Sequence, residues 1–342
     1  MPSPERKQRE AISRRGVTRG YGPWIAGLDG GGSKTACLIC DREGRVVGSG
    51  LGGPINVNFV SDEVASQSLH EALQEARLAA GLSSGTDIAV LAVAGPVPTR
   101  LVNDAAKRHF ALGELLRVGE GDAALLAAQP WLDIRVGVTV DSGTGSLAMG
   151  VNAAGERAGA GGWGALLGDE GSGYWIGEEA LRAAVRASDG REKPTVLEGV
   201  IGAALGIRDL HELIPLVYRR GLGRREIAAL APAVAQTARD GDAVAREIMH
   251  RAAQELALMV RAVIERLHME QEEFAVVPFG SVFKASDLLL PPFERLVKEI
   301  APRSVIVLPE HEPVIGCLVA GLQHLGIGLS PAVLDNLGGA GQ

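Results

Sequence analysis

Two short stretches rich in glycine could bind phosphate groups, and the first of them is GLDGGGSKT. It is close to the phosphate-loop pattern G-x-x-x-x-G-K-[ST], but a serine separates its last glycine from the lysine. Glycines let the backbone approach phosphate oxygens, while the serine hydroxyl can donate a hydrogen bond and the lysine can add positive charge. The candidate phosphate-binding residues of this stretch are Gly30, Gly31, Gly32, Ser33 and Lys34.

The residues after these glycines exclude the usual phosphate loop, which opens a helix whose N-terminus faces the phosphates. Here the chain continues as TACLICDREGRVVGSG, which is an apolar, β-rich run, a polar turn and a second short run. The segment WIAGLD before the glycines also has the composition of a strand. The pattern predicts a β-hairpin whose glycine bend presents backbone N–H groups to an anion.

The second stretch, TVDSGTGSL, repeats this arrangement later in the chain. In both stretches an aspartate ends a predicted strand, Asp29 in the first and Asp141 in the second, and a bend of glycine and hydroxyl residues leads to another strand. Because glycine turns are common, one such bend is weak evidence. Two related bends, each in an α/β half, predict a duplicated domain with a nucleotide held between the copies. The candidate residues of the second bend are Gly143, Thr144 and Gly145.

The bulk composition limits the classes of protein that need to be considered. The chain has 342 residues, 46% of them hydrophobic, and its net charge of −7 argues against a nucleic-acid partner. No apolar run is long enough to cross a membrane. Three cysteines fit a reducing compartment, so we expect a cytoplasmic protein. Residues 1–22 are charged, without the apolar core of a secretory signal, and are expected to form a mobile extension.

The elements that must position the two bends alternate between strands and helices, which predicts an α/β architecture. The expected N-terminal domain spans residues 23–130, and the expected C-terminal domain spans residues 131–330 and contains a helical insertion. A helix expected at residues 313–325 could pack back on the N-terminal domain. Residues 331–342 are expected to be a disordered tail.

Five segments occur in an order that points to a known family: LDGGGSKT, GDAALLAA, DSGTGS, GGWGALLGDEGSGYWIG and FGSVFKASDLL. Together they resemble the N-acetylglucosamine kinase group of the BadF/BadG/BcrA/BcrD-type ATPases, within the superfamily of sugar kinases, Hsp70 and actin. The resemblance runs from about Trp24 to Gly326, and the tryptophan-containing segment is its most specific part. It implies two RNase H-like (actin-like ATPase) domains around a nucleotide- and sugar-binding cleft. It also implies transfer of the γ-phosphoryl group of ATP to the 6-hydroxyl of N-acetylglucosamine or a close relative.

The resemblance assigns Asp122, in GEGDAALLAA, as the catalytic base and as a contact of the sugar. A sugar hydroxyl is a poor nucleophile, and a carboxylate within hydrogen-bond reach can orient it and accept its proton. Asp122 also stands where a predicted strand ends and a helix begins. Its alternative role is therefore that of a helix N-cap, which stabilises a helix by about 1 kcal/mol.

For the nucleotide, the resemblance implies that Thr144 contacts phosphate and that Gly280 and Ser281 lie beside the adenosine. An ordinary turn between a strand and a helix is the alternative for the latter pair. Asp29 and Asp141 are implied to hold Mg²⁺ through water, because this cation keeps much of its hydration shell; the alternative is that they only form turns. The implied cofactors are ATP and Mg²⁺.

For the sugar, the resemblance implies contacts from Asn56, Gly162 and Asp169 in addition to the catalytic base. Amide and carboxylate groups suit this role because they can pair with several hydroxyls at once. Asp169 or its neighbour Glu170 could instead cap the helix that comes after them. The sequence predicts that one of the two does so.

The absence of an aromatic residue at one position near Asn56 leaves the identity of the sugar open. Animal members of the family have an aromatic residue two positions after the asparagine, where this chain has Asn58. Glucosamine, N-acetylmuramic acid and other amino sugars therefore stay open as substrates. The aromatic residues of the tryptophan-containing segment are expected to pack in the core or in loops, and these are Trp163, Tyr174 and Trp175.

Two other functions stay open at this point. Some members of the wider ATPase family activate dehydratases or reductases through an iron–sulfur cluster, and Cys37 and Cys40 form a C-x-x-C pair. Both lie in a predicted strand, where residues three apart point to opposite faces, so we expect them, like Cys317, to be structural. The second alternative is a sugar sensor without catalysis. A homodimer is expected from the family resemblance alone.

Overall fold

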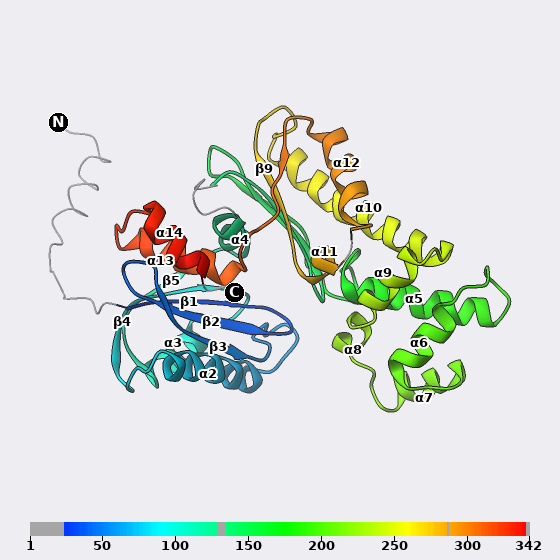
Figure 1. Cartoon of the computed structure of the whole chain (residues 1–342), viewed down its shortest axis with the longest axis horizontal. Coiled ribbons are helices and arrows are strands. Elements are labelled where there is room, and N and C mark those ends of the chain that lie inside the picture. The colour runs from blue at the N-terminus through cyan, green and yellow to red at the C-terminus, as the bar shows by residue number, and fades with distance from the viewer. Residues whose placement is uncertain (1–23, 129–134, 286, 340–342) are drawn as a thin grey trace.

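The computed structural model describes residues 24–128, 135–285 and 287–339. The expected extension at residues 1–22 and the expected domain boundary at residue 130 lie outside the described residues. Two five-stranded mixed sheets, each covered by helices, form the molecule (Figure 1). This confirms the predicted α/β fold with two RNase H-like domains.

The first sheet, sheet A, has the strand order β3-β2-β1-β4-β5. β1 is its central strand and pairs antiparallel with β2 and parallel with β4. The strands are β1 (Trp24–Gly30), β2 (Thr35–Cys40), β3 (Val46–Gly52), β4 (Thr86–Ala94) and β5 (Phe110–Arg117).

The second sheet, sheet B, has the order β10-β9-β6-β7-β8 and therefore repeats the topology of sheet A. Its central strand, β6, pairs antiparallel with β7 and parallel with β9. In both sheets the first strand along the chain begins a three-stranded antiparallel meander on one side and pairs with parallel strands on the other, as expected of a duplicated domain. The strands are β6 (Gly137–Ser142), β7 (Ser146–Val151), β8 (Arg157–Gly161), β9 (Ala275–Phe279) and β10 (Val305–Ile306).

Alternate glycines of β3 bring helix α2 (Asp62–Ala79) close onto sheet A. Gly48, Gly50 and Gly52 face this helix, and a Cβ added at any of them would lie 2.1–2.3 Å from a carbonyl oxygen of α2. The apolar residues of α2 recur at helical spacing and form a core with β1, β2 and β4. Helix α3 (Thr99–Lys107) packs beside α2 on the same face of the sheet (Figure 1).

The opposite face of sheet A is covered by α13 (Pro313–His324) and α14 (Pro331–Gly338), from the end of the chain (Figure 1). The prediction of a disordered tail from residue 331 is therefore wrong for α14. Ser330 caps this helix, and its apolar residues Val333 and Leu337 are buried one helical turn apart. The buried residues of this core are Ile25, Cys40, Ile315, Leu318, Val319, Leu322, Val333 and Leu337.

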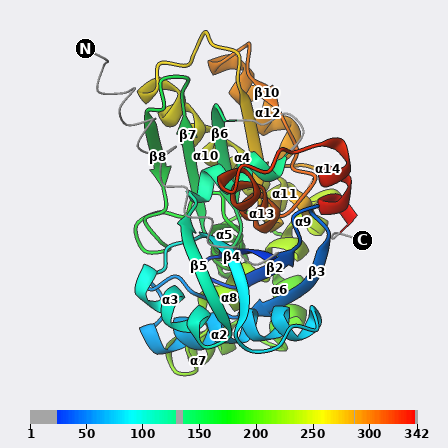
Figure 2. The same cartoon turned by 90° about the vertical axis from the view of Figure 1, so that its left-hand side faces the viewer.

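Helix α4 (Glu120–Ala128) crosses α13 between the two sheets, as Figure 2 shows. The crossing is so close that a Cβ added at Gly316 of α13 would lie 1.9 Å from the carbonyl oxygen of Ala123. Only glycine leaves room for the α4 backbone at this position. The contact fixes the position of the N-terminal turn of α4 relative to α13, and this turn carries Asp122.

The C-terminal domain packs its helices around α10 (Ala243–Arg266), whose N-cap Asp242 accepts hydrogen bonds from the N–H groups of Val244 and Ala245. Helix α12 (Leu290–Ile300) packs on α10, and α11 (Ser281–Ala285) follows β9. The helices inserted before α10 are α5 (Gly173–Ser188), α6 (Leu197–Leu205), the short 3₁₀ helix Leu210–Glu212, α7 (Leu213–Tyr218), α8 (Arg224–Ala228) and α9 (Ala231–Arg239).

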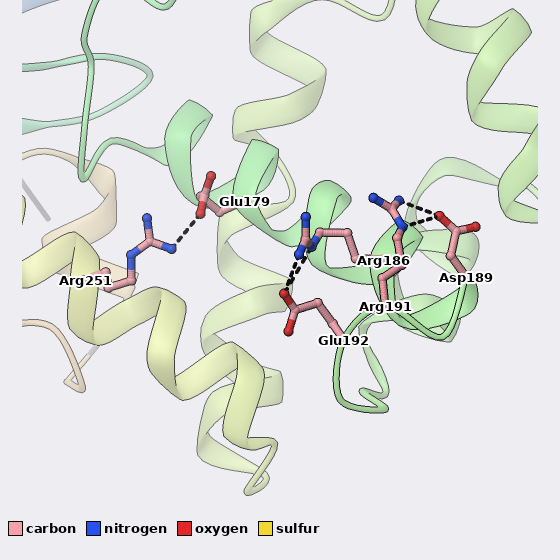
Figure 3. A network of polar contacts seen from close by, with 6 residues as sticks. All are labelled: Glu179, Arg186, Asp189, Arg191, Glu192 and Arg251. Atoms are coloured by element: carbon pink, nitrogen blue, oxygen red, sulfur yellow. Dashed lines mark hydrogen bonds and ion pairs between the residues drawn. The ribbon is translucent and has the colours of Figure 1, made fainter.

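Arg251 connects α10 to α5 at the surface (Figure 3). Its Nη1 donates to Oε2 of Glu179 at 2.8 Å, and its guanidinium carbon lies 5.1 Å from the centroid of a Trp175 ring. Each exposed ion pair contributes little, so the buried apolar residues of the two helices hold this region together. Two further pairs lie near the C-terminal end of α5, Arg186 with Glu192 and Arg191 with Asp189.

The three cysteines are buried. Cys37 belongs to the core under α2 and Cys40 to the core under α13, so the two side chains point to opposite faces of β2, as predicted. Among the described residues, no helix combines the length and the apolarity that a membrane span needs.

Candidate active site

The two glycine bends meet where the domains face each other. The first joins β1 to β2 and the second joins β6 to β7, and each is closed by a backbone hydrogen bond, donated by Gly31 at 3.1 Å and by Gly143 at 3.0 Å. The hydroxyl oxygens of Ser33 and Thr144 lie 2.7 Å apart, so the bends of the two domains touch. A single anion could therefore receive hydrogen bonds from both domains.

Open space lies beside the first bend. A Cβ added at Gly31 would meet no atom within 4 Å, and one at Gly32 would meet only the Phe59 ring, at 3.9 Å. Neither glycine has a positive φ, so the backbone conformation does not require glycine at these positions. The missing side chains leave room for a ligand. Gly30 differs, since its Cβ would collide with Ile55.

The glycines around the second bend are required by packing within the protein. A Cβ at Gly145 would lie 2.9 Å from Oδ1 of Asp169. Gly280 has φ +100°, and its Cβ would lie 2.4 Å from the carbonyl oxygen of Ser142 and 2.5 Å from Oδ1 of Asp141. Gly280 thus lets the β9–α11 turn pack against the end of β6. Its predicted contact with adenosine is not needed to explain the glycine.

A pocket of about 280 Å³ opens beside the contact between the bends. Its polar lining includes Ser33, Thr144, Ser281 and Arg225, next to Gly143. Its apolar lining consists mainly of alanines at the end of α8 and along α9, together with Met249 of α10. The structure therefore brings Ser281 to the same pocket as both predicted phosphate-binding bends. A pocket with apolar and polar lining suits a molecule with an aromatic base and a phosphate chain.

Asp29 and Asp141 occupy equivalent places, since each is the penultimate residue of the strand that leads into its bend. No group of three or more histidine, cysteine or carboxylate residues lies together in the part of the chain that the structure describes. Two carboxylates beside bends that are predicted to bind phosphate fit Mg²⁺, which keeps several waters and is held mainly by substrate phosphates. The residues present therefore suit this ion.

Asp122 lies in the first turn of α4 and is paired across the domains. Its Oδ1 accepts a hydrogen bond from Nη1 of Arg157 at 2.8 Å, and Arg157 is the first residue of β8 in sheet B. Because α4 begins at Glu120, Asp122 is not the N-cap of the helix, and that alternative does not apply. The carboxylate is partly exposed, with 29% of its side chain accessible, so it can reach a substrate hydroxyl.

Asn56 lies in the loop between β3 and α2, next to the first bend. Its N–H donates to the carbonyl oxygen of Gly31 at 3.2 Å, and its Oδ1 accepts from the N–H of Asn58 at 3.0 Å. No residue that the structure describes accepts from Nδ2 of Asn56. This nitrogen can therefore donate to a sugar hydroxyl.

Asp169 is buried against the second bend and has a positive φ of 63°. Its Oδ1 accepts from the N–H of Ser146 at 3.3 Å, and its Oδ2 pairs with Arg224 of α8. Burial raises the pKa of this carboxyl, although the Ser146 N–H and the Arg224 charge act in the opposite direction. The N–H of Gly162 donates to the carbonyl oxygen of the same serine at 2.9 Å. Both predicted sugar contacts are thus tied to the second bend.

Comparison with known proteins identifies the family of this chain. A profile of the BadF/BadG/BcrA/BcrD ATPase family matches residues 26–321. The chain belongs to this family. It is 32% identical over 301 residues to the N-acetylmuramic acid/N-acetylglucosamine kinase of Clostridium acetobutylicum, covering 86% of this chain and 97% of that protein. It is 26% identical over 308 residues to the N-acetyl-D-glucosamine kinase of Dictyostelium discoideum, with the same coverage.

A solved structure extends the comparison to the fold of this BadF-type chain. The structure of a candidate N-acetylglucosamine kinase from Chromobacterium violaceum superposes with a TM-score of 0.71 at 24% identity, covering 88% of this chain and 99% of that one. At this level of identity the likeness shows the fold alone.

One prediction around the tryptophan-containing segment of this BadF-type protein is wrong. The N-cap of α5 is Ser172, whose hydroxyl accepts from the N–H of Trp175, so neither Asp169 nor Glu170 caps that helix. Of the tryptophans expected in the core or in loops, Trp175 is buried, whereas Trp163 lies in the glycine-flanked loop after β8 and is 74% exposed.

Several charged residues at the site of this family member were missed by sequence reasoning, and two of them are Glu312 and Lys284 of α11, which pair with each other. Lys34 of the first bend, which was predicted, pairs with the same Glu312 carboxylate at 3.8 Å. Burial acts to raise the pKa of Glu312, but the hydrogen bond from Lys284 and the charge of Lys34 outweigh it and lower the pKa. No local motif marks such residues, since their partners lie far away in the chain. The other missed residues are Arg157, Arg224 and the pocket residue Arg225.

Proposed function

We propose that this chain is an ATP-dependent amino-sugar kinase that transfers the γ-phosphoryl group of ATP to the 6-hydroxyl of N-acetylglucosamine. The observation that carries the proposal is the contact between Ser33 and Thr144, which brings two phosphate-binding bends together beside one pocket. The two curated relatives named above act on amino sugars by their names, which supports the substrate class.

The pocket and the bends receive the nucleotide in this proposal. The alanine-rich part of the pocket lining takes the base, while the backbone N–H groups and hydroxyls of the bends donate to the phosphates. Mg²⁺ held near Asp29 and Asp141 would neutralise phosphate charge. Lys34 and Arg225 add positive charge at the first bend and at the pocket wall.

Asp122 acts on the sugar. Its carboxylate orients the 6-hydroxyl and accepts its proton as the oxygen attacks the γ-phosphorus. The hydrogen bond from Arg157 occupies Oδ1, which leaves Oδ2 to accept the proton. Nδ2 of Asn56 donates to another hydroxyl of the same sugar. Most of the catalysis then comes from positioning and from charge neutralisation.

N-acetylmuramic acid is the second candidate substrate. The Clostridium relative is named for both sugars, and the loop residue Asn58 leaves space where an aromatic ring packs on the sugar in animal members of the family. The iron–sulfur alternative has little support, because Cys37 and Cys40 are buried on opposite faces of one strand.

The test is a coupled assay of ADP release with ATP and Mg²⁺ over a panel of sugars. The panel contains N-acetylglucosamine, N-acetylmuramic acid, glucosamine, N-acetylmannosamine and glucose, and ³¹P–¹H correlation spectra locate the phosphate on the product. We expect release with an N-acetylated sugar and phosphate on its 6-oxygen. Phosphate on another oxygen would overturn the assignment to the 6-hydroxyl. If the protein binds ATP but releases no ADP with any sugar of the panel, the kinase proposal is overturned.

A further inference from the structure

Arg224 contacts both domains with one side chain. It begins α8 in the C-terminal domain, and its guanidinium carbon lies 4.3 Å from the centroid of the Phe59 ring, in the loop that continues from Asn56 in the N-terminal domain. The same guanidinium donates from Nη2 to Oδ2 of Asp169. A cation over the face of an aromatic ring is attracted to it, and pairing with a carboxylate on another edge does not block that face.

The contact continues from Asp169 to the second phosphate bend. Its other oxygen, Oδ1, accepts from the N–H of Ser146, and a Cβ at Gly145 would lie 2.9 Å from that oxygen. The side chain is almost fully buried, so it cannot shift without moving the bend. Arg224 therefore sits on a continuous path between the sugar-side loop and the residues next to Thr144.

Phe59 connects the path to the first bend as well. A Cβ at Gly32 would lie 3.9 Å from its ring, and one at Gly164 of the tryptophan-containing loop would lie 3.1 Å from it. The N–H of Phe59 donates to the carbonyl oxygen of Asn56 at 2.9 Å. Nearly half of the residue is exposed, so the ring is not part of a domain core. Its close neighbours come from both domains.

Burial of part of the Arg224 side chain costs free energy, which indicates that its contact with Phe59 is specific. Its Nε is buried and has no hydrogen-bond partner among the residues that the structure describes. An unsatisfied buried donor is unfavourable, so the contacts of the guanidinium with Asp169, with Phe59 and with the Tyr174 ring, whose centroid lies 5.9 Å away, must outweigh that loss. Opening of the domains would separate the arginine from Phe59 and remove one of these contacts.

We infer that Arg224 is a positioning residue that couples occupation of the sugar site to occupation of the nucleotide site. A sugar bound at Asn56 holds the loop and Phe59 in place, Phe59 holds Arg224, and Arg224 with Asp169 holds the second phosphate bend. Each ligand then strengthens the binding of the other by the same factor. The inference rests on the proposed kinase function.

The experiment measures the dissociation constant of a sugar by titration calorimetry, with and without a non-hydrolysable ATP analogue and Mg²⁺. The sugar is one that the wild-type protein phosphorylates, and the ratio of the two constants is the coupling factor. Phe59→Leu keeps an apolar side chain and the Arg224–Asp169 pair but removes the aromatic face. Phe59→Tyr keeps the face. Tyr218→Leu, at an 83% exposed aromatic residue of α7, is the matched control.

We expect a coupling factor above one for the wild type, Phe59→Tyr and Tyr218→Leu, and a factor lower by about threefold or more for Phe59→Leu. Arg224→Lys, which keeps the charge opposite Asp169, lowers it in the same direction. In a protein that already carries Arg224→Lys, Phe59→Leu should lower the coupling factor little further, because the two residues act as one pair. A merely structural role would change the melting temperature and leave the coupling factor unchanged.

The outcomes separate the inference from the function on which it rests. A wild-type enzyme that is active but has a coupling factor of one overturns the inference alone. A Phe59→Leu variant that keeps the wild-type coupling factor also overturns the inference alone. The same holds if the coupling factor of Tyr218→Leu falls as far as that of Phe59→Leu. If the wild type phosphorylates no sugar of the panel, the proposed function falls and the inference falls with it.

Discussion

The hydroxyl of Ser33, from the bend of sheet A, lies 2.7 Å from the hydroxyl of Thr144, from the bend of sheet B. Each hydroxyl has the other as a partner when no phosphate is present, and both can turn to donate to a phosphate oxygen. This exchange keeps two polar groups satisfied before and after the nucleotide binds.

Removing the hydroxyl of Ser33 or of Thr144 is expected to lower the catalytic efficiency with ATP. Hydrogen bonds to charged groups contribute about 1.5–3 kcal/mol, so Ser33→Ala and Thr144→Val should each lower kcat/KM for ATP by about 10-fold to 100-fold. The sugar KM should change much less. Steady-state kinetics check this, with the exposed Ser84→Ala as control. Unchanged ATP kinetics in both variants would show that the hydroxyls do not contact the nucleotide.

Asp122→Asn keeps the shape of the side chain and removes its ability to accept a proton. We expect kcat to fall by about 10²-fold to 10⁴-fold, the usual range for loss of a general base, while binding of an ATP analogue stays the same. The matched control is Asp104→Asn, at an exposed position of α3. Near-normal sugar phosphorylation by Asp122→Asn would exclude the proposed base.

Gly316→Ala is expected to displace Asp122, the proposed catalytic base, without contacting it. The new Cβ would lie 1.9 Å from the carbonyl oxygen of Ala123, so α4 must move and Asp122 with it. We expect the free energy of unfolding to fall by about 1–3 kcal/mol and kcat to fall as well. Gly328→Ala is the control, since its Cβ would meet no atom within 4 Å. Denaturant unfolding and kinetics that match the wild type would contradict the close crossing.

The cysteines should be unreactive in the folded protein. Burial raises the pKa of Cys37 and Cys40 to about 12, and it raises that of Cys317 well above the usual value. The thiolate is the reactive form, so an aromatic disulfide reagent at pH 8 should label these residues only as fast as the protein unfolds. In urea all three should react. Rapid labelling of the native protein would contradict this prediction and favour a redox role for the cysteines.

Acid should destabilise the protein through His109. This residue is buried next to His70, with Nε2 and Nδ1 of the two rings 2.9 Å apart, and burial together with the nearby charges of His70, Arg77 and Arg108 lowers its pKa from 6.5 to about 4. The folded protein therefore binds this proton less readily than the unfolded chain. The contribution to stability is complete above pH 6.5 and is lost as the pH falls towards 4, with an upper limit of about 3 kcal/mol.

Urea unfolding at several pH values checks the role of His109. His109→Gln should show a smaller loss of stability between pH 6.5 and pH 4 than the wild type. His250→Gln, on α10 in the other domain, should show the wild-type slope. Parallel curves for the wild type and His109→Gln would assign the acid sensitivity to other groups.

The local patterns of the sequence predicted the central strands and both bends. A short apolar run typical of a strand, an aspartate near its end and a glycine bend are signals that lie within about ten residues, and they do not depend on distant partners. For this reason Gly31, Ser33, Gly143 and Thr144 can be recognised as candidates without any knowledge of how the two bends meet.

The elements that the sequence did not predict depend on distant contacts. Val333 and Leu337 lie in a short, glycine-rich tail without a long apolar pattern, and the core that stabilises them is formed by residues such as Ile25 and Cys40. Likewise, Arg224 has no local motif, because its partners are Phe59 and Asp169. Their roles could be recognised only after the chain was folded in space.

The return of α13 and α14 to sheet A has a consequence for biosynthesis. The first strand of sheet A, β1, emerges from the ribosome long before the helices that cover one of its faces, because almost three hundred residues separate them. Until then Ile25, Cys40 and their neighbours lack the apolar cover that they have in the finished core. The N-terminal half must therefore wait for the C-terminal end before it can complete its fold, and a chain cut short before residue 313 would expose an aggregation-prone sheet face.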